Sequence, residues 1–340
     1  MNDSVLDRLR PDQRELLGTP TSGRNGGVAE PMLAVLSDRR AFDDAWLFER
    51  KLDGVRALAM REGDRVRLFS RGGTPRGPTY PELVAALEVQ TRRDFALDGE
   101  VVAIRSGRTD FSLLQQRSGL TDPRAARATG IPVFYYLFDL LRLDGHDLTR
   151  LPLRTRKALL RDAFAFHGPQ RFTTHRNAWS PELLDGACAR GWEGLIAKRA
   201  DAPYVHRRST DWLKLKCGAG QEFVIGGFTE PAGSRVGFGA LLLGYYESDR
   251  LCYAGKVGTG YDTRTLRDLR HRLDVLGNDL SPFHDAIGER AVHWVRPELV
   301  AQIGFTEWTR DGRLRHPRFL GLRADKPPAD VVRERPKKGP

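Results

Sequence analysis

A short apolar run leads directly into a cluster of charges early in the chain, and this junction restricts how the chain can fold. Residues 45–48 read Ala-Trp-Leu-Phe, and residues 49–56 read Glu-Arg-Lys-Leu-Asp-Gly-Val-Arg. The apolar run predicts the end of a buried strand, from which Lys51 emerges into a cleft. A lysine that is partly desolvated and placed near other cations loses its proton more readily and then acts as a nucleophile. Lys51 is therefore a candidate catalytic residue.

The residues after Lys51 fit the same interpretation. Asp53 and Arg56 could orient the amine and hold an anionic partner, and Gly54 lets the backbone approach a ligand closely. The alternative is a strand end with solvated charges, which we would prefer if this motif stood alone.

The overall charge favours a polyanionic partner. The 340 residues carry a formal charge of +11, which is typical of nucleic-acid-binding proteins, although a solvated basic surface is the alternative. A chain of this length predicts two domains, each able to bury its own core.

The cysteines and the absence of long apolar runs point to a cytoplasmic protein. The spacing of Cys188, Cys217 and Cys252 predicts neither a zinc site nor a disulfide framework, which fits a reducing compartment. No apolar run is long enough to span a bilayer, and the polar N-terminus does not resemble a signal peptide. We therefore expect no membrane partner.

The order of the predicted elements indicates an α+β protein with two domains. Residues 1–30 predict a flexible arm because they combine charge with a glycine-rich stretch. The first domain is expected over residues 31–218 and mixes strands with helices. The second is expected over residues 219–333, and residues 334–340 predict a loose tail.

Two local patterns are informative within these domains. Residues 57–70 predict a β-hairpin in the first domain. In the second, about five strands and one helix at residues 263–276 suit an OB-fold barrel, an architecture that commonly binds nucleic acid.

Several charged residues lie at the ends of predicted strands or inside them. Arg71 follows a strand and precedes two glycines, so it suits contact with phosphate or ribose, although a surface arginine is the alternative. Glu100 interrupts the apolar strand expected at residues 95–104, and a buried carboxylate is costly unless it is paired or binds a ligand. Glu100 is therefore a candidate for a ribose hydroxyl or a metal ion, with a bulge residue as the alternative.

Two further strands carry candidate ligand contacts. Phe138, near the end of a strongly apolar strand, could stack on a flat base or belong to the core. Lys214 and Lys216 alternate with apolar residues and are expected on one face of a strand. There they would clamp a phosphate, or they would protect an exposed sheet edge against aggregation.

Together these segments resemble, in order, the nucleotidyltransferase motifs of ATP-dependent DNA ligases. The segments are residues 51–56, 70–73, 97–100, 138–141, 193–198 and 212–216, and residues 323–326 resemble the last motif of the family. Residues 191–194 and 257–260 look most like the ligase module of bacterial ligase D, an end-joining enzyme. Leu52 stands where that subfamily often has tryptophan, and the polymerase and nuclease modules are not in this sequence.

The resemblance implies a nucleotidyltransferase (adenylation) domain followed by an OB-fold domain, and a three-step reaction. Lys51 would attack the α-phosphate of ATP and carry AMP, which would pass to a DNA 5′-phosphate. A 3′-hydroxyl would then displace the AMP and seal the break. Each step is a displacement at phosphorus that depends on positioning and on charge neutralisation, with Mg²⁺ or Mn²⁺ as the metal ion.

The resemblance also implies residues that bind the nucleoside. Phe138 would stack on adenine and Glu49 would contact the edge of the base. Arg56 and Arg71 would bind sugar and phosphate. Glu100 would hold the ribose, and it remains a candidate metal ligand.

The resemblance also implies residues that bind phosphate groups and a metal ion. Glu193 is the preferred metal ligand, and Lys214 and Lys216 would neutralise the α-phosphate. Arg323 and Lys326 would move in with the OB-fold domain to orient the pyrophosphate.

The implied partner is double-stranded DNA with nicks or ends, bound by a monomer in the bacterial cytoplasm or nucleoid. A Ku-like end-binding protein and separate polymerase and nuclease proteins would assist. The alternatives are an RNA ligase, a capping enzyme that uses GTP, or a non-catalytic DNA-binding scaffold. The intact lysines argue against the scaffold, and the ligase-like residues 323–326 argue against capping.

Overall fold

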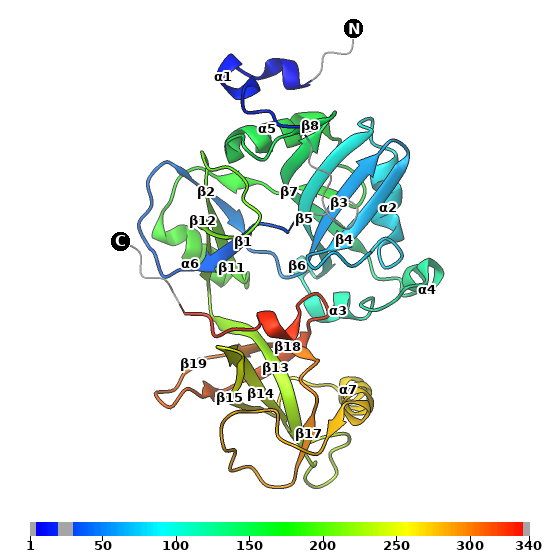
Figure 1. Cartoon of the computed structure of the whole chain (residues 1–340), viewed down its shortest axis with the longest axis vertical. Helices are drawn as coiled ribbons and strands as arrows, with labels where there is room; N and C mark the ends of the chain where they lie inside the picture. Colours follow the sequence, from blue (N-terminus) through cyan, green and yellow to red (C-terminus); the bar gives the residue numbers. More distant parts are fainter. Residues whose placement is uncertain (1–4, 20–29, 336–340) are drawn as a thin grey trace. The chain divides into compact units, whose positions relative to one another are not determined.

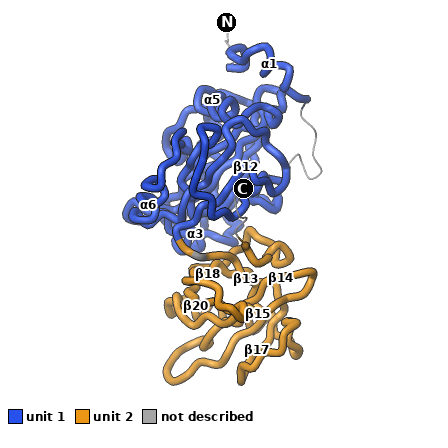
Figure 2. Tube along the Cα trace, turned by 90° about the vertical axis from the view of Figure 1, so that its left-hand side faces the viewer, with its two compact units in different colours: residues 1–217, 336–340 blue, residues 218–335 orange. Residues whose placement is uncertain are grey.

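The computed structural model describes residues 5–19 and 30–335 (Figure 1). The chain divides into two compact units, one that ends at Cys217 and one that comprises Gly218–Arg335 (Figure 2). The boundary expected from the sequence, between residues 218 and 219, lies one residue later. Among the helices of the described residues, none is long and apolar enough to cross a bilayer.

The larger sheet of the first unit is mostly antiparallel, with β5 at its centre. Its main strand order is β4-β3-β5-β7-β8, while β6 pairs with β5 and β9 pairs in parallel with β7. The predicted hairpin is confirmed, because β3 and β4 pair from Ala57 opposite Ser70 to Glu62 opposite Arg65. The strands are β3 (Val55–Glu62), β4 (Arg65–Ser70), β5 (Asp94–Arg105), β6 (Arg108–Thr109), β7 (Val133–Leu143), β8 (His146–Asp147) and β9 (Gln170–Phe172).

The smaller sheet of this unit brings together two parts of the chain that are far apart in sequence, residues 33–50 and residues 175–216. Its strand order is β1-β12-β11-β2-β10, and β11 lies between β2 and β12. Ile196 on β11 is therefore opposite Glu49 on β2 and Lys214 on β12. The strands are β1 (Leu33–Leu36), β2 (Trp46–Arg50), β10 (His175–Arg176), β11 (Gly194–Arg199) and β12 (Arg208–Lys216).

Helices cover these sheets and begin where the sequence supplies a cap or a proline. Asp110 accepts a hydrogen bond from the Leu113 amide at the start of α3, and Asp122 does so from the Arg124 amide at α4. Apolar residues of α2 and α5 enter the core of the larger sheet, and those of α6 enter the core of the smaller one. The helices are α2 (Pro81–Glu88), α3 (Phe111–Gln115), α4 (Pro123–Ala128), α5 (Leu153–Ala163) and α6 (Pro181–Ala189).

The predicted flexible arm is wrong over residues 5–19. A 3₁₀ helix (Val5–Arg8) and α1 (Pro11–Arg14) form here, and three apolar side chains are buried, namely Val5, Leu6 and Leu9. The backbones of Gly18 and Asp147 exchange two hydrogen bonds. Apolar residues on one face thus pack into the core of the larger sheet, which outweighs the polar composition. Residues 1–4 and 20–29 of the expected arm lie outside the described residues.

The second unit is a curved set of strands around the long β13 (Ala219–Thr229), which pairs with β14, β17 and β18. The predicted helix is α7 (Thr263–Val275), capped by Asp262, whose side chain accepts from the Thr265 amide. Its leucines enter the core of the unit. The other elements are β14 (Leu241–Glu247), β15 (Arg250–Val257), β16 (Gly277–Asn278), β17 (Val292–Val295), β18 (Val300–Phe305), β19 (Glu307–Trp308), β20 (Leu314–Arg315), β21 (Arg318–Leu322) and a 3₁₀ turn (Pro328–Asp330).

The expected loose tail begins later than predicted. The Glu334 amide donates to Oε1 of Gln221 at 3.0 Å, and Arg335 lies 3.6 Å from Glu247. These contacts hold the chain to the second unit as far as residue 335. The rest of the tail, residues 336–340, lies outside the described residues.

Candidate active site

Lys51 follows β2 directly and is held by its backbone and by its side chain. Its amide donates to the carbonyl of Gly194 at 2.9 Å, and its ammonium forms an ion pair with Glu193. A Cβ on Gly194 would lie 2.0 Å from the carbonyl oxygen of Leu215, so only glycine lets β11 approach β12 here. The same glycine thus fixes Glu193 beside the amine of Lys51.

The electrostatics of Lys51 differ from the sequence-based expectation. Burial alone would lower the pKa of Lys51, but the carboxylates of Glu193, Asp53 and Glu100 outweigh it and raise that pKa above its ordinary value. The expectation of a readily deprotonated amine assumed neighbouring cations, and the immediate neighbours are acids. The site as described stabilises the ammonium form and holds it in one place.

These carboxylates suit a metal ion that is shared with a substrate. Mg²⁺ prefers oxygen ligands and is usually held by one or two carboxylates together with phosphate oxygens. Within residues 5–19 and 30–335, no group of three or more histidine, cysteine or acidic side chains is arranged to hold a metal by itself. Glu193 with Glu100 or Asp53 therefore fits a site that phosphate oxygens complete.

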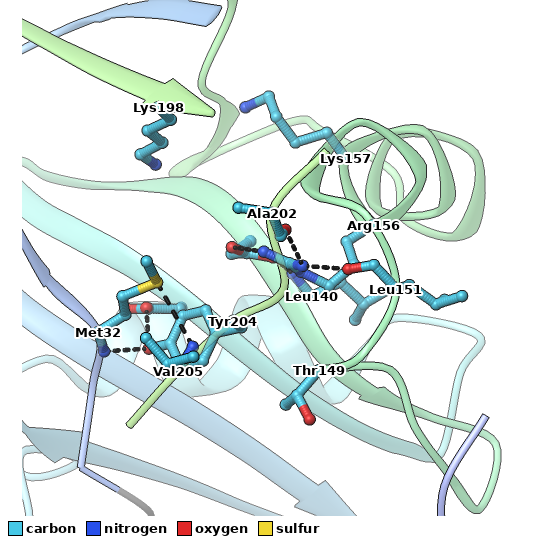
Figure 3. Close-up of polar contacts among 12 residues, drawn as sticks. Met32, Leu140, Thr149, Leu151, Arg156, Lys157, Lys198, Ala202, Tyr204 and Val205 are labelled. Carbon is cyan, nitrogen blue, oxygen red and sulfur yellow. Dashed lines mark hydrogen bonds and ion pairs between the residues drawn. The ribbon is translucent and has the colours of Figure 1, made fainter. Parts of the chain in front are cut away.

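The side chain of Arg56 forms hydrogen bonds with other residues of the first unit. Its Nε and Nη2 each lie 2.5 Å from an oxygen of the fully buried Asp98, and its Nη2 also donates to the carbonyl of Met32 at 3.1 Å. Tyr204 donates its hydroxyl to Asp98 at 2.7 Å. The same hydroxyl accepts from the amide of Met32 at 2.9 Å (Figure 3). Burial, followed by the charge of Asp98, raises the pKa of Tyr204 well above its ordinary value.

Phe138 packs beside Arg56 in a small cluster of buried side chains. Its residue is 8% exposed and packs with Met32, Tyr204 and Trp212. The Arg56 guanidinium lies 4.7 Å from the centroid of the ring. The sequence was compatible with either base stacking or core packing for Phe138. In the structure, its side chain packs in the core.

Glu49 is buried between two lysines that sequence reasoning missed. Its carboxylate lies 2.6 Å from Nζ of Lys157 on α5 and 2.7 Å from Nζ of Lys198 on β11. Figure 3 shows the two lysines on their separate elements. Burial alone would raise the pKa of Glu49, but Lys157 and Lys198 lower it overall. Burial lowers the pKa of Lys198 to about 8, despite the opposing effect of Glu49.

A second buried ion pair supports the strand that carries Phe138. Arg156 on α5 donates to both oxygens of Asp139, at 2.7 and 2.9 Å, and all of these atoms are buried. Arg156 also donates to the carbonyls of Leu151 and Ala202 (Figure 3). The pair therefore joins β7, α5 and the segment that leads to Tyr204.

The other predicted residues of the first unit lie on strands around Lys51. Glu100 on β5 is paired in register with Arg56 on β3, and it is close enough to contribute to the raised pKa of Lys51. Lys214 and Lys216 are half-buried on β12 and alternate with buried apolar residues. Arg71 follows β4 in a turn.

The two remaining predicted residues belong to the second unit. Arg323 donates to both oxygens of Asp325, at 2.9 and 2.8 Å, and Lys326 donates to Glu222 at 3.0 Å. Both cations are therefore held by acids of their own unit.

The cysteine expectation is wrong for one pair. Cys188 on α6 and Cys217 after β12 form a disulfide with Cα atoms 5.2 Å apart, while Cys252 is free. The two are 29 residues apart in sequence, and no local spacing reveals the pair. They meet because β11 runs from the end of α6 along β12.

Two family models match the chain. Residues 29–216 match "ATP dependent DNA ligase domain", and residues 234–326 match "ATP dependent DNA ligase C terminal region". A Pseudomonas aeruginosa protein, "Multifunctional non-homologous end joining protein LigD", is 40% identical over 98% of this chain and 41% of its own length. A similarly described Mycobacterium tuberculosis protein is 40% identical over 85% of this chain and 37% of its length. The chain thus spans about two fifths of these relatives.

A solved structure is also similar to this chain. It is described as "mycobacterial DNA ligase D complexed with ATP and MES" and is 35% identical to this chain, with a TM-score of 0.63. The match covers 90% of this chain and 98% of that one.

Proposed function

This chain belongs to the family of ATP-dependent DNA ligases, and on that premise we propose that it seals breaks in duplex DNA during bacterial end joining. Family membership supports the predicted activity and confirms the predicted α+β architecture, a nucleotidyltransferase domain followed by an OB-fold domain. It speaks against an RNA ligase, a capping enzyme or a non-catalytic scaffold. The end-joining role is inferred from the LigD relatives, whose full length this chain does not span.

The single observation that carries the catalytic proposal is the placement of Lys51 against Glu193. The amine would attack the α-phosphate of ATP, form a phosphorus–nitrogen bond and release pyrophosphate, so the ammonium must first give up a proton. Mg²⁺ or Mn²⁺ held by Glu193, with Glu100 as the second candidate, would supply positive charge that favours the neutral amine. Lys214 and Lys216, on the strand next to Glu193, would balance the charge of the phosphate.

The nucleoside would lie against the buried cluster that contains Phe138. Adenine would stack on this ring, with Glu49 at the edge of the base. Because the residue is 8% exposed, stacking requires a neighbour to shift, and Lys198 and Arg56 are the cations against the ring. Glu100 would hold the ribose.

Four further cations would bind the sugar and the phosphates. Arg56 and Arg71 would contact the sugar and the phosphates. In the second unit, Arg323 and Lys326 would orient the pyrophosphate. The ion pairs these two make with Asp325 and Glu222 would then have to exchange for phosphate contacts.

The partners follow from the same premise. We propose that the enzyme acts as a monomer in the bacterial cytoplasm, where ATP and chromosomal DNA meet. A Ku-like end-binding protein would recruit it, and polymerase and nuclease activities would prepare the ends.

Sealing assays on matched substrates test this function. The full chain is incubated with Mg²⁺ and ATP or GTP, on a nicked DNA duplex and on a nicked RNA duplex of the same sequence. We expect sealing of the DNA with ATP only, and its loss in Lys51→Ala. Equal sealing of RNA, or sealing with GTP alone, would contradict the proposal.

A further inference from the structure

The disulfide lies at the junction between the active site and the end of the first unit. Cys217 is exposed and is the last residue of that unit before Gly218. Cys188 is half-buried and packs against the core of the smaller sheet. Because Cys217 is exposed, a small thiol can reach the bond from solvent.

Backbone hydrogen bonds connect both cysteines to the turn that carries Glu193. The Cys217 amide donates to the carbonyl of Glu193 at 3.1 Å, and the carbonyl of Cys188 accepts from the Gly191 amide at 2.9 Å. The Trp192 amide donates to Ala187 on α6 at 3.0 Å. The disulfide therefore closes a ring around residues 191–193, and the Glu193 side chain of that ring pairs with Lys51.

We propose that Cys188 and Cys217 are a redox modification site whose disulfide form holds Glu193 in place for the attack by Lys51. The proposal rests on the function proposed above for Lys51 and Glu193. Its reagents are a low-molecular-weight thiol and the corresponding disulfide, which exchange with exposed protein disulfides.

The exchange is a two-electron step. The thiolate of a small thiol attacks Sγ of Cys217, which forms a mixed disulfide and releases the Cys188 thiolate. A second small thiol then breaks the mixed disulfide, so two small thiols become one small disulfide and the protein gains two thiols. The reverse sequence, with a small disulfide as oxidant, restores the bond.

Reduction removes the covalent link and leaves the backbone hydrogen bonds, the packing of Trp192 and the Glu193–Lys51 ion pair to hold residues 191–193. Misplacement of a catalytic group by 1 Å can cost about a hundredfold in rate, so a partial loosening of Glu193 should cost less. We expect the dithiol form to transfer AMP to Lys51 about fivefold more slowly, and its Cys217 amide to exchange with solvent more rapidly.

The test compares the full chain after dithiothreitol with the same chain after oxidised glutathione. Peptide masses without reductant report the bond, and amide hydrogen exchange reports Cys217 and residues 191–193. Single-turnover transfer of AMP from labelled ATP reports the chemistry. A Cys188→Ser/Cys217→Ser double variant should no longer respond to reductant, whereas Cys252→Ser should respond as the unmodified chain does.

We expect a bond between peptides that contain Cys188 and Cys217, with slower exchange and faster AMP transfer in the oxidised chain. Thiols that stay free after oxidised glutathione would overturn the proposal, as would equal exchange and equal transfer in the two forms. If neither form accepts AMP, the function of Lys51 has failed, and hydrogen exchange alone still decides whether the disulfide holds Glu193.

Discussion

The two nitrogens of Arg56 that face Asp98 each lie 2.5 Å from one of its carboxylate oxygens, and the acid is fully buried. Asp98→Ala would leave a guanidinium unpaired in a largely buried position, so we expect the free energy of unfolding to fall by about 3 kcal/mol. Denaturant unfolding of the full chain measures this. Asp64→Ala, which breaks an exposed pair with Arg93, is the control and should cost under about 1 kcal/mol.

The lowered pKa of Lys198 predicts a pH dependence of stability. Its pKa is about 8 in the folded chain, against an ordinary value of 10.5, so the unfolded chain binds more protons between these pH values. The folded state therefore gains stability as pH rises from about 8 to 10.5, on the order of 2–3 kcal/mol from this group.

Unfolding free energies at pH 7.5, 9 and 10.5, for the unmodified chain and Lys198→Met, test this assignment. We expect the difference between the two proteins to change with pH in favour of the unmodified chain. Parallel curves would show that Lys198 titrates normally.

The raised pKa of Lys51 predicts the pH profile of AMP transfer. Because the neutral amine is the nucleophile, the rate should rise with pH until the amine is largely deprotonated. Glu193→Gln removes the strongest of the charges that raise this pKa. In the chain without ATP and metal ion, the pH midpoint for chemical acetylation of Lys51 should then move to lower pH, and an unmoved midpoint would contradict the pairing.

The disulfide should also stabilise the first unit. Because Cys188 and Cys217 are 29 residues apart, closing that loop in the unfolded chain should contribute about 3–4 kcal/mol. Cys188→Ser/Cys217→Ser should unfold at lower denaturant than the oxidised chain and together with the reduced chain. Identical midpoints for oxidised and reduced protein would rule out this contribution.

The sequence supported those parts of the structure that depend on local periodicity. The hairpin of β3 and β4 and the leucine face of α7 follow from alternation and from helical spacing, which a single segment displays by itself. The emergence of Lys51 from a buried strand follows from the apolar run before it.

Contacts between segments that are distant in sequence could not be predicted from local periodicity. Glu49 and Lys157 are 108 residues apart, and periodicity shows which face is buried but not what it meets. One signal was available: Lys157 lies four residues after Leu153 and three before Leu160, on the same face of α5, so its burial and its need for an acid could have been predicted.

The most direct measurement of the central claim is the position of AMP on the protein. The full chain is incubated with ATP and Mg²⁺, digested, and its peptides are sequenced by mass spectrometry, with Lys51→Ala and the exposed-lysine control Lys256→Ala in parallel. We predict AMP on the side chain of Lys51 in the unmodified chain and in Lys256→Ala, and none in Lys51→Ala. AMP on another residue, or AMP retained in Lys51→Ala, would contradict the account.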